Sequence, residues 1–338
     1  MNEHDGFKRE GAKLSRRQVM QTLGALSLPM SLAGAARAQA GFPSKPLRIL
    51  VSFSAGSSTD LLARLIGERL SEQLKQSVVV DNRPGAGGII GTQALARSAP
   101  DGYTIGIGSL ATMALLPATM KEVPYDSVRD FTPLSELMSV DLLMVTSTKV
   151  PAKTLPEFVA WAKAQPNPIF MGTFGAGTSA HFAGHLFCQN AGIKFETIHY
   201  RSQSDGLVGI VNGDCHFMVP PPSVVEPHVK TGKLRALATN GKVRLKTFPE
   251  VPTFGELGYA NMNFSNWVGM LAPAKTPQPI VDRLAAELLI AANHPTVRAK
   301  LEENGYRLVA SKPDEFAATI RNDVRFWSDF VKTSGFTL

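Results

Sequence analysis

Two short segments carry the residue types best suited to holding an anion. They are Phe53-Ser54-Ala55-Gly56-Ser57-Ser58-Thr59-Asp60 and Gly172-Thr173-Phe174-Gly175-Ala176-Gly177-Thr178-Ser179-Ala180-His181. Each offers several hydroxyl groups and stands where an expected strand gives way to an expected helix. Because free amide N–H groups and the positive end of the helix dipole gather at a helix start, both segments predict sites for a carboxylate or another anion.

The same residue types also fit a purely structural role, the capping of the two helices. In the first segment Gly56 allows a tight turn, and Asp60 would cap free amides or complement the dipole. The pair of segments is more informative than either one alone. Two anion-seeking helix starts would suit a ligand with two polar ends.

Motifs of catalytic, metal or cofactor chemistry are incomplete. Neither segment ends in the Gly-Lys-Ser/Thr of a P-loop, and Ile90 interrupts the glycine spacing that a dinucleotide site needs. His181 and His185 lie one helical turn apart, but His-Phe-Ala-Gly-His lacks the zincin glutamate. Ser179 is not set in Gly-x-Ser-x-Gly. We expect no catalytic residue, no metal and no cofactor, and therefore no enzyme.

Strand and helix signals alternate along most of the chain, which predicts an α/β protein with a largely parallel sheet. Thr154 and Glu157 have the spacing of a capping box at a further helix start. We expect two crossings between two lobes, with a ligand cleft between them. The expected lobes are residues 41–142 plus 236–338 and residues 143–235, with Leu234–Ala238 as the strand that returns to the first lobe.

The N-terminus predicts a signal peptide over residues 1–40. Lys13, Arg16 and Arg17 precede an apolar stretch that is too short to span a bilayer, and small-x-small cleavage patterns follow it. The sequence Ser-Arg-Arg-Gln-Val-Met at residues 15–20 indicates the twin-arginine route, with an ordinary secretion signal as the alternative. The expected location is the periplasm, after removal of this segment.

Charge and cysteine content narrow the classes of partner. The chain has a net charge of +7, and six of its 35 Lys/Arg and three of its 28 Asp/Glu lie in residues 1–40, which leaves +4 for the rest. No basic run interleaved with aromatic residues appears, so nucleic-acid binding is not expected. Cys188 and Cys215 are compatible with a disulfide in an oxidising compartment or with two buried free thiols.

Several segments together resemble the Bug-type, TctC-like solute receptors of tripartite tricarboxylate transporters. Besides the first anion segment, they are Val80-Asp81-Asn82-Arg83-Pro84-Gly85-Ala86-Gly87-Gly88, Ala99-Pro100-Asp101-Gly102-Tyr103, Gly175-Ala176-Gly177-Thr178-Ser179-Ala180-His181, Gly232-Lys233-Leu234-Arg235-Ala236-Leu237-Ala238, Val251-Pro252-Thr253 and Trp267-Val268-Gly269. They occur in family order over nearly all of the chain beyond residue 40.

The resemblance implies a two-lobed periplasmic-binding-protein fold, type II-like, with two crossover strands and a cleft that closes around its ligand. It implies a small carboxylate ligand, delivery to the membrane permease subunits of the transporter, and a monomeric receptor. The ligand-binding residues that it implies are Ser54, Gly56, Ser57, Ser58, Thr59, Asp60, Gly177, Thr178, Ser179 and His181.

Three positions depart from the family pattern and leave the identity of the ligand open. Ser57 stands where a second glycine is common, Pro220-Pro221-Pro222 replaces a stretch that often holds an acidic residue, and Tyr200-Arg201-Ser202 stands in place of Tyr-Lys-Gly. Two other functions stay open at this point. They are a receptor that feeds a sensor protein, and an exported hydrolase that uses Ser179.

Overall fold

The computed structural model describes residues 41–200 and 202–334. The chain divides into two compact units, residues 1–44 and 45–338, and both sheets lie in the second. The predicted signal peptide lies outside the described residues. Within the described part of the chain, no helix is both long and apolar enough to cross a membrane.

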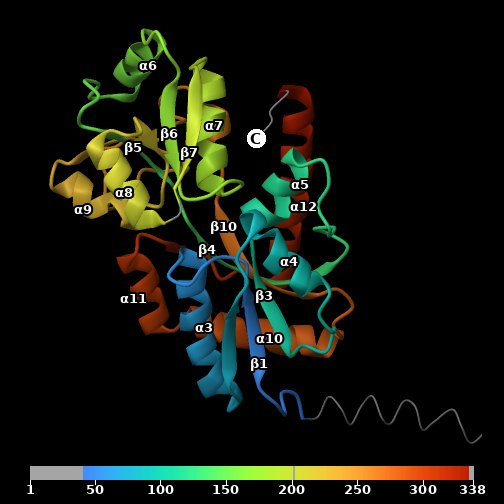
Figure 1. The fold of residues 1–338 in the computed structure, drawn as a ribbon. Coiled ribbons are helices and arrows are strands. Elements are labelled where there is room, and N and C mark those ends of the chain that lie inside the picture. The colour runs from blue at the N-terminus through green and yellow to red at the C-terminus, as the bar shows by residue number, and fades with distance from the viewer. Residues whose placement is uncertain (1–40, 201, 335–338) are drawn as a thin grey trace, which may run out of the picture. The chain divides into compact units, whose positions relative to one another are not determined.

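The first sheet joins strands from both ends of the second unit (Figure 1). Its strands are β1 (Leu47–Val51), β2 (Val78–Asn82), β3 (Thr104–Ser109), β4 (Phe131–Ser139), β10 (Trp267–Pro273) and β11 (Arg307–Leu308). Their order is β11-β4-β10-β3-β1-β2. β1 is parallel to β2 and β3, whereas β10 runs antiparallel to both β3 and β4. The parallel part is the βαβαβ unit expected from the sequence.

Helices cover this sheet and bury apolar side chains against it. They are α3 (Ser58–Leu74), α4 (Ile89–Ala96), α5 (Leu116–Thr119), α10 (Gln278–Ala292), α11 (Pro295–Glu303) and α12 (Pro313–Ser334), with short helical turns at η1 (Ala86–Gly88), η2 (Ala111–Leu115) and η3 (Ala260–Met262). In α3 these side chains include Leu62, Ile66 and Leu70, all fully buried. We call these elements, together with the first sheet, the first lobe.

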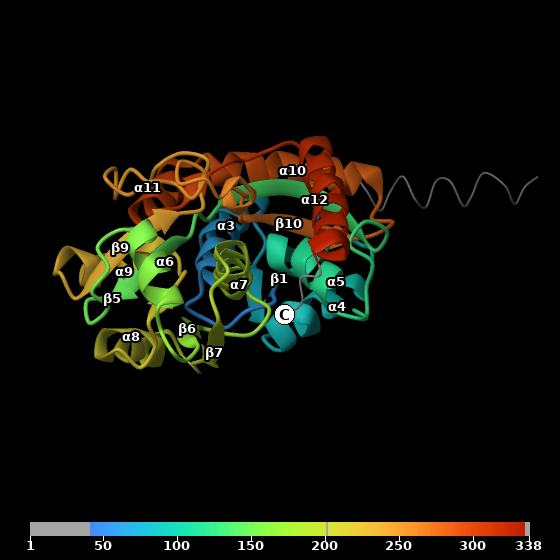
Figure 2. The ribbon, with the colours of Figure 1, turned by 90° about the horizontal axis from the view of Figure 1, so that it is seen from above.

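The second sheet comes from one continuous stretch of chain. Its strands are β5 (Leu143–Ser147), β6 (Ile169–Thr173), β7 (Phe195–His199), β8 (Phe217–Met218) and β9 (Leu234–Thr239), and its helices are α6 (Leu155–Lys163), α7 (Ser179–Ala191), α8 (Gln203–Asn212) and α9 (Pro222–Lys230). The strand order is β7-β6-β8-β5-β9. Figure 2 shows α6, α8 and α9 gathered around this sheet, apart from α4, α5 and α12. We call this group the second lobe.

Local signals set the ends of several helices in the second lobe. Thr154 caps α6 as predicted, because its Oγ1 accepts the amide of Glu157 at 3.3 Å. The Glu157 carboxylate accepts in turn from the amide of Lys153 at 2.7 Å. Gly192 ends α7 in the left-handed conformation, with φ of 64°, which glycine adopts without strain.

Two crossings connect the lobes, and the position of the second corrects the sequence analysis. β9 pairs antiparallel with β5 from Leu143 opposite Thr239 to Ser147 opposite Leu234. The strand expected to return to the first lobe therefore belongs to the second sheet, and placing residues 236–239 in the first lobe was wrong. The apolar pattern of this strand does not reveal its partner, because a buried strand looks the same in either sheet.

The two crossings are hydrogen-bonded to each other. The fully buried Asn240 accepts the amide of Leu142 at 2.6 Å and donates to the carbonyl of Phe264 at 3.3 Å. The amide of Val140 donates to the carbonyl of Asn266 at 2.9 Å. These bonds join residues next to both sheets into one connecting layer.

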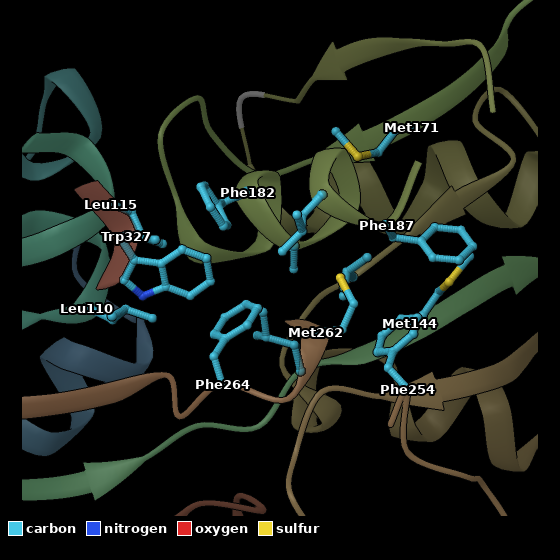
Figure 3. Packing of buried hydrophobic residues seen from close by; sticks show 14 of the residues in the cluster. Leu110, Leu115, Met144, Met171, Phe182, Phe187, Phe254, Met262, Phe264 and Trp327 are labelled. Carbon is cyan, nitrogen blue, oxygen red and sulfur yellow. The ribbon is translucent and has the colours of Figure 1, made fainter. Parts of the chain in front are cut away.

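An apolar core continues from one lobe into the other (Figure 3). The ring of Trp327 on α12 lies 4.9 Å from the ring of Phe182 on α7 and 5.2 Å from that of Phe264, and both pairs are nearly perpendicular. Edge-to-face contacts of this kind are favourable for aromatic rings. Both cysteines are buried free thiols, so the disulfide alternative is excluded.

Candidate functional site

A cavity of about 500 Å³ is lined by residues of both lobes and of the crossings. This volume lies within the range of small-molecule sites. From the first lobe come Phe53, Ser54, Ala55, Gly56, Ser57, Ser58, Thr59, Ser109, Ala111 and Val268, from the second Phe174, Thr178, Ser179, Ala180 and Ser202, and from the segments between secondary-structure elements Val140, Leu142, Pro221 and Asn266. The cavity brings the two predicted anion segments together.

The first segment forms the turn between β1 and α3. Gly56 has φ of +82°, a conformation that glycine adopts without strain. Ser57 is the N-cap of α3, and its hydroxyl accepts the amide of Asp60 at 3.3 Å and lies 2.9 Å from the Thr59 hydroxyl. The turn therefore presents Ser54, Gly56, Ser57, Ser58 and Thr59, five of the predicted binding residues, to the cavity.

Asp60 supports this turn and does not line the cavity. Its carboxylate accepts from the Gly56 amide at 2.9 Å, from Arg64 Nε at 3.0 Å and from Asn82 Nδ2 at 2.9 Å. Burial opposes ionisation, but these hydrogen bonds and the Arg64 charge lower the pKa of Asp60 below its ordinary value. In this structure Asp60 thus holds the loop, and the direct ligand contact expected for it stays a prediction.

The second segment forms the turn between β6 and α7 in a similar way. Thr178 caps α7, since its Oγ1 accepts the amide of His181 at 3.2 Å and donates to the carbonyl of Gly175 at 3.0 Å. Thr178 and Ser179 line the cavity as predicted. Gly177 and His181 are not among the lining residues.

His181 instead fixes the backbone of the second segment. Its Nδ1 accepts from the Gly177 amide at 3.2 Å, and its ring packs 4.9 Å from that of His199. Burial and the neighbouring His199 and His185 lower the pKa of His181 to about 4. A neutral imidazole is therefore the form that accepts this hydrogen bond at neutral pH.

The first residues of α3 and α7 line the same cavity. An α-helix leaves its first N–H groups without a carbonyl partner. In α3 the free amides are those of Ser58 and Thr59, because the third amide, of Asp60, is bonded to the Ser57 hydroxyl. In α7 they are those of Ser179 and Ala180, because the amide of His181 is bonded to the Thr178 hydroxyl. All four residues line the cavity, so it combines N–H donors with serine and threonine hydroxyls. Such donors replace the water that a buried carboxylate loses.

Several lining residues escaped the sequence analysis. Ser202 caps α8 by accepting the amide of Asp205 at 3.1 Å, and the spacing of these two residues is a capping signal that was available in the sequence. Asn266 and Val268 flank Trp267, which is fully buried. Phe53, Phe174, Val140 and Leu142 give the cavity its apolar part. Phe53 and Phe174 lie within the two predicted anion segments, whereas Val140 and Leu142 carry no local signal of their position.

The lobes also meet at their glycine-rich turns, beside the cavity. A Cβ atom on Gly87 would lie 3.2 Å from the carbonyl oxygen of Ala176. A Cβ atom on Gly177 would lie 2.7 Å from Leu116 Cδ2. The run Gly85, Ala86, Gly87 and Gly88 has positive φ throughout and forms a tight turn before α4.

Two sheets, two crossings and a cavity between them define a periplasmic-binding-protein fold. The chain also matches the sequence profile of the tripartite tricarboxylate transporter family receptor, TctC, over residues 62–336. The match covers most of the chain, and the protein belongs to this family.

Individual relatives agree with this assignment. BugT of Bordetella pertussis is 34% identical over 299 residues, which are 87% of this chain and 90% of BugT. A solved structure described as a periplasmic transporter has 33% identity and a TM-score of 0.80, over 88% of this chain and 99% of that one. The R. palustris protein Rpa4515 with adipate has 27% identity and a TM-score of 0.80, with the same coverage of both chains.

Proposed function

We propose that the protein is a periplasmic receptor that captures a small carboxylate between its lobes and delivers it to a tripartite tricarboxylate-type transporter. The observation that carries the proposal is the pair of capped helix starts, at Ser58 and Ser179, whose first amides face one cavity. Amides and hydroxyls offered from opposite lobes favour a ligand with negatively charged ends.

The apolar residues of the cavity favour a ligand with a hydrocarbon part. Phe53, Phe174, Val140 and Leu142 would contact it while the helix starts hold the carboxylates. The solved relatives support this class of ligand, since Rpa4515 was determined with adipate and MatC of Rhodopseudomonas palustris, at 27% identity and a TM-score of 0.79, with bound malate.

Binding at both helix starts would favour closure of the lobes, because a ligand held by only one lobe gains half of the contacts. The proposal includes the remaining expectations: a leader over residues 1–40 read by the twin-arginine route, a monomer in solution and no catalytic step. It also includes the predicted binding residues, which are Ser54, Gly56, Ser57, Ser58, Thr59, Asp60, Gly177, Thr178, Ser179 and His181.

The experiment is a thermal-shift screen of the purified protein against mono-, di- and tricarboxylates, aromatic acids and amino acids. A ligand that binds only the folded state stabilises it by about 2.7 kcal/mol at a hundredfold excess over its Kd. A saturable shift confined to carboxylates is the expected result. A panel without any shift would contradict the proposal, and hydrolysis of a chromogenic ester that Ser179→Ala abolishes would replace it with the hydrolase alternative.

A further inference from the structure

Tyr306 lies between α11 and β11 of the first lobe and reaches toward both the cavity and the second lobe. Its side chain is buried, and its hydroxyl lies 3.4 Å from the hydroxyl of Ser223 on α9. The side chain of Ser58 lies close enough to influence the ionisation of this phenol. Ser58 lines the cavity at the start of α3. One phenol group therefore lies beside a residue of the candidate binding site and contacts the opposite lobe.

The backbones of the two lobes also approach each other at this point. Gly305, next to Tyr306, has φ of +73°, and a Cβ atom placed on it would lie 3.8 Å from Cβ of Pro222. Burial raises the pKa of Tyr306 above its ordinary value, so the phenol keeps its proton at physiological pH. Tyr306 can then donate one hydrogen bond and accept another at the same time.

An anion in the cavity determines the direction of these hydrogen bonds. A carboxylate accepts only, so Ser58 must turn its O–H toward the ligand in order to bind it. The Ser58 oxygen is then free to accept from Tyr306, and the Tyr306 oxygen to accept from Ser223. Each hydroxyl uses one donor and one acceptor, and chains with a single direction strengthen their members.

We propose that Ser223, Tyr306 and Ser58 form a hydrogen-bond chain that crosses the cleft and ends on the bound anion. Tyr306 is a positioning residue in this chain, since it acts on the ligand through Ser58. Because Ser223 belongs to the second lobe, the chain is complete only when the lobes are together. The inference rests on the proposed function, to which it adds a coupling between anion capture and closure.

The test compares Ser223→Ala, Tyr306→Phe and the double variant in the full chain, with adipate and malate as probes. A net hydrogen bond is worth about 0.5–1.5 kcal/mol, so each single change should weaken binding roughly two- to tenfold. The loss should appear as faster dissociation of the probe. In a Tyr306→Phe background, Ser223→Ala should have no further effect on affinity, because the chain is already broken.

The matched control is Tyr125→Phe. Tyr125 is also buried, and its hydroxyl donates to the carbonyl of Thr112 at 2.6 Å within the first lobe. This variant should lower the melting temperature and leave the Kd of the probe unchanged. Equal losses of affinity in Tyr125→Phe and Tyr306→Phe, or independent effects of the two chain residues, would overturn the chain.

Failure of the chain and failure of the proposed function are distinguishable. If the unsubstituted protein binds neither probe nor any carboxylate of the panel, the proposed function fails. Small-angle scattering of the ligand-free protein then still tests the bridge, because Tyr306→Phe should increase the radius of gyration if the hydroxyl holds the lobes together. An unchanged radius in that case would exclude the bridge as well.

Discussion

Single hydroxyl groups in this protein cap a helix and face the cavity at the same time. Thr178 is the clearest case, since its Oγ1 accepts the His181 amide while the residue lines the cavity. Thr154 caps α6 with nearly the same geometry, at 3.3 Å from the Glu157 amide, but it is not a lining residue. Substituting each threonine in turn therefore distinguishes the loss of stability caused by removing an N-cap from the loss of affinity caused by removing a ligand contact.

We predict that Thr178→Ala and Thr154→Ala each lower the free energy of unfolding by about 1 kcal/mol, the usual cost of an N-cap. Only Thr178→Ala should also weaken carboxylate binding, because its helix start faces the cavity. Denaturant melts and titration calorimetry of both variants provide the comparison. An equal loss of affinity in the two would show that binding depends on overall stability alone.

A second prediction at the scale of one residue concerns Glu136 on β4. It is 8% exposed, and burial, with Asp323 nearby, raises its pKa to about 7 from an ordinary 4.5, although Arg307 and Thr319 oppose the rise. The folded state therefore binds the proton more tightly than the unfolded chain. Its contribution to stability is complete below pH 4.5 and is lost as the pH rises through 7.

Glu136→Gln should therefore gain stability relative to the unsubstituted protein as the pH is raised from 4.5 to 7, because glutamine has no proton to lose. The gain should level off above the pKa of Glu136. Melting temperatures of both proteins between pH 4 and 8 measure it. Curves that stay parallel across this range would show that Glu136 ionises normally.

At the scale of elements, the sequence predicts best what is encoded locally. The starts of α3, α6 and α7 follow from cap residues and a few neighbours, and the starts of α3 and α7 border the cavity of the candidate site. β4 was not predicted, although it is paired on both sides. Pro133 and the polar Ser135 and Glu136 hide its pattern, and a register shift beside Pro133 accommodates the proline.

Features that depend on contacts between distant segments of the chain could not be predicted from the sequence. The partner of β9, the apolar residues of the cavity and the contact of Tyr306 with Ser223 all join residues far apart in the chain. The alternation of strands and helices predicted the lobes, and the resemblance to a family supplied the ligand class and the binding residues, of which Asp60, Gly177 and His181 do not line the cavity. Residues that support a loop and residues that contact a ligand look alike in a motif.

The glycine-rich turn before α4 is an element whose role can be tested. Gly87 has φ of +66°, and an added Cβ would press on the Ala176 carbonyl of the other lobe. Gly232 has a similar φ of +70° with nothing within 4 Å of such a Cβ. Alanine at either position bears the backbone strain of about 1 kcal/mol, but only at position 87 does it meet the opposite lobe.

We predict that Gly87→Ala weakens carboxylate binding and enlarges the radius of gyration of the liganded protein, whereas Gly232→Ala changes neither. Both variants should lose similar amounts of stability. Small-angle scattering and calorimetry give the two readouts. If Gly87→Ala binds as tightly as Gly232→Ala, the contact with Ala176 does not limit closure.

At the scale of the whole molecule, the position of β10 has a consequence for how the protein is made. β10 lies between β3 and β4, so the first sheet lacks an inner strand until residue 273 has left the ribosome. The second sheet draws only on residues 143–239 and is available earlier. The first lobe is therefore begun first during synthesis and completed last. A nascent chain that stalls before β10 would have a complete second lobe, while β3 and β4 of the first lobe would still lack the strand that pairs with both.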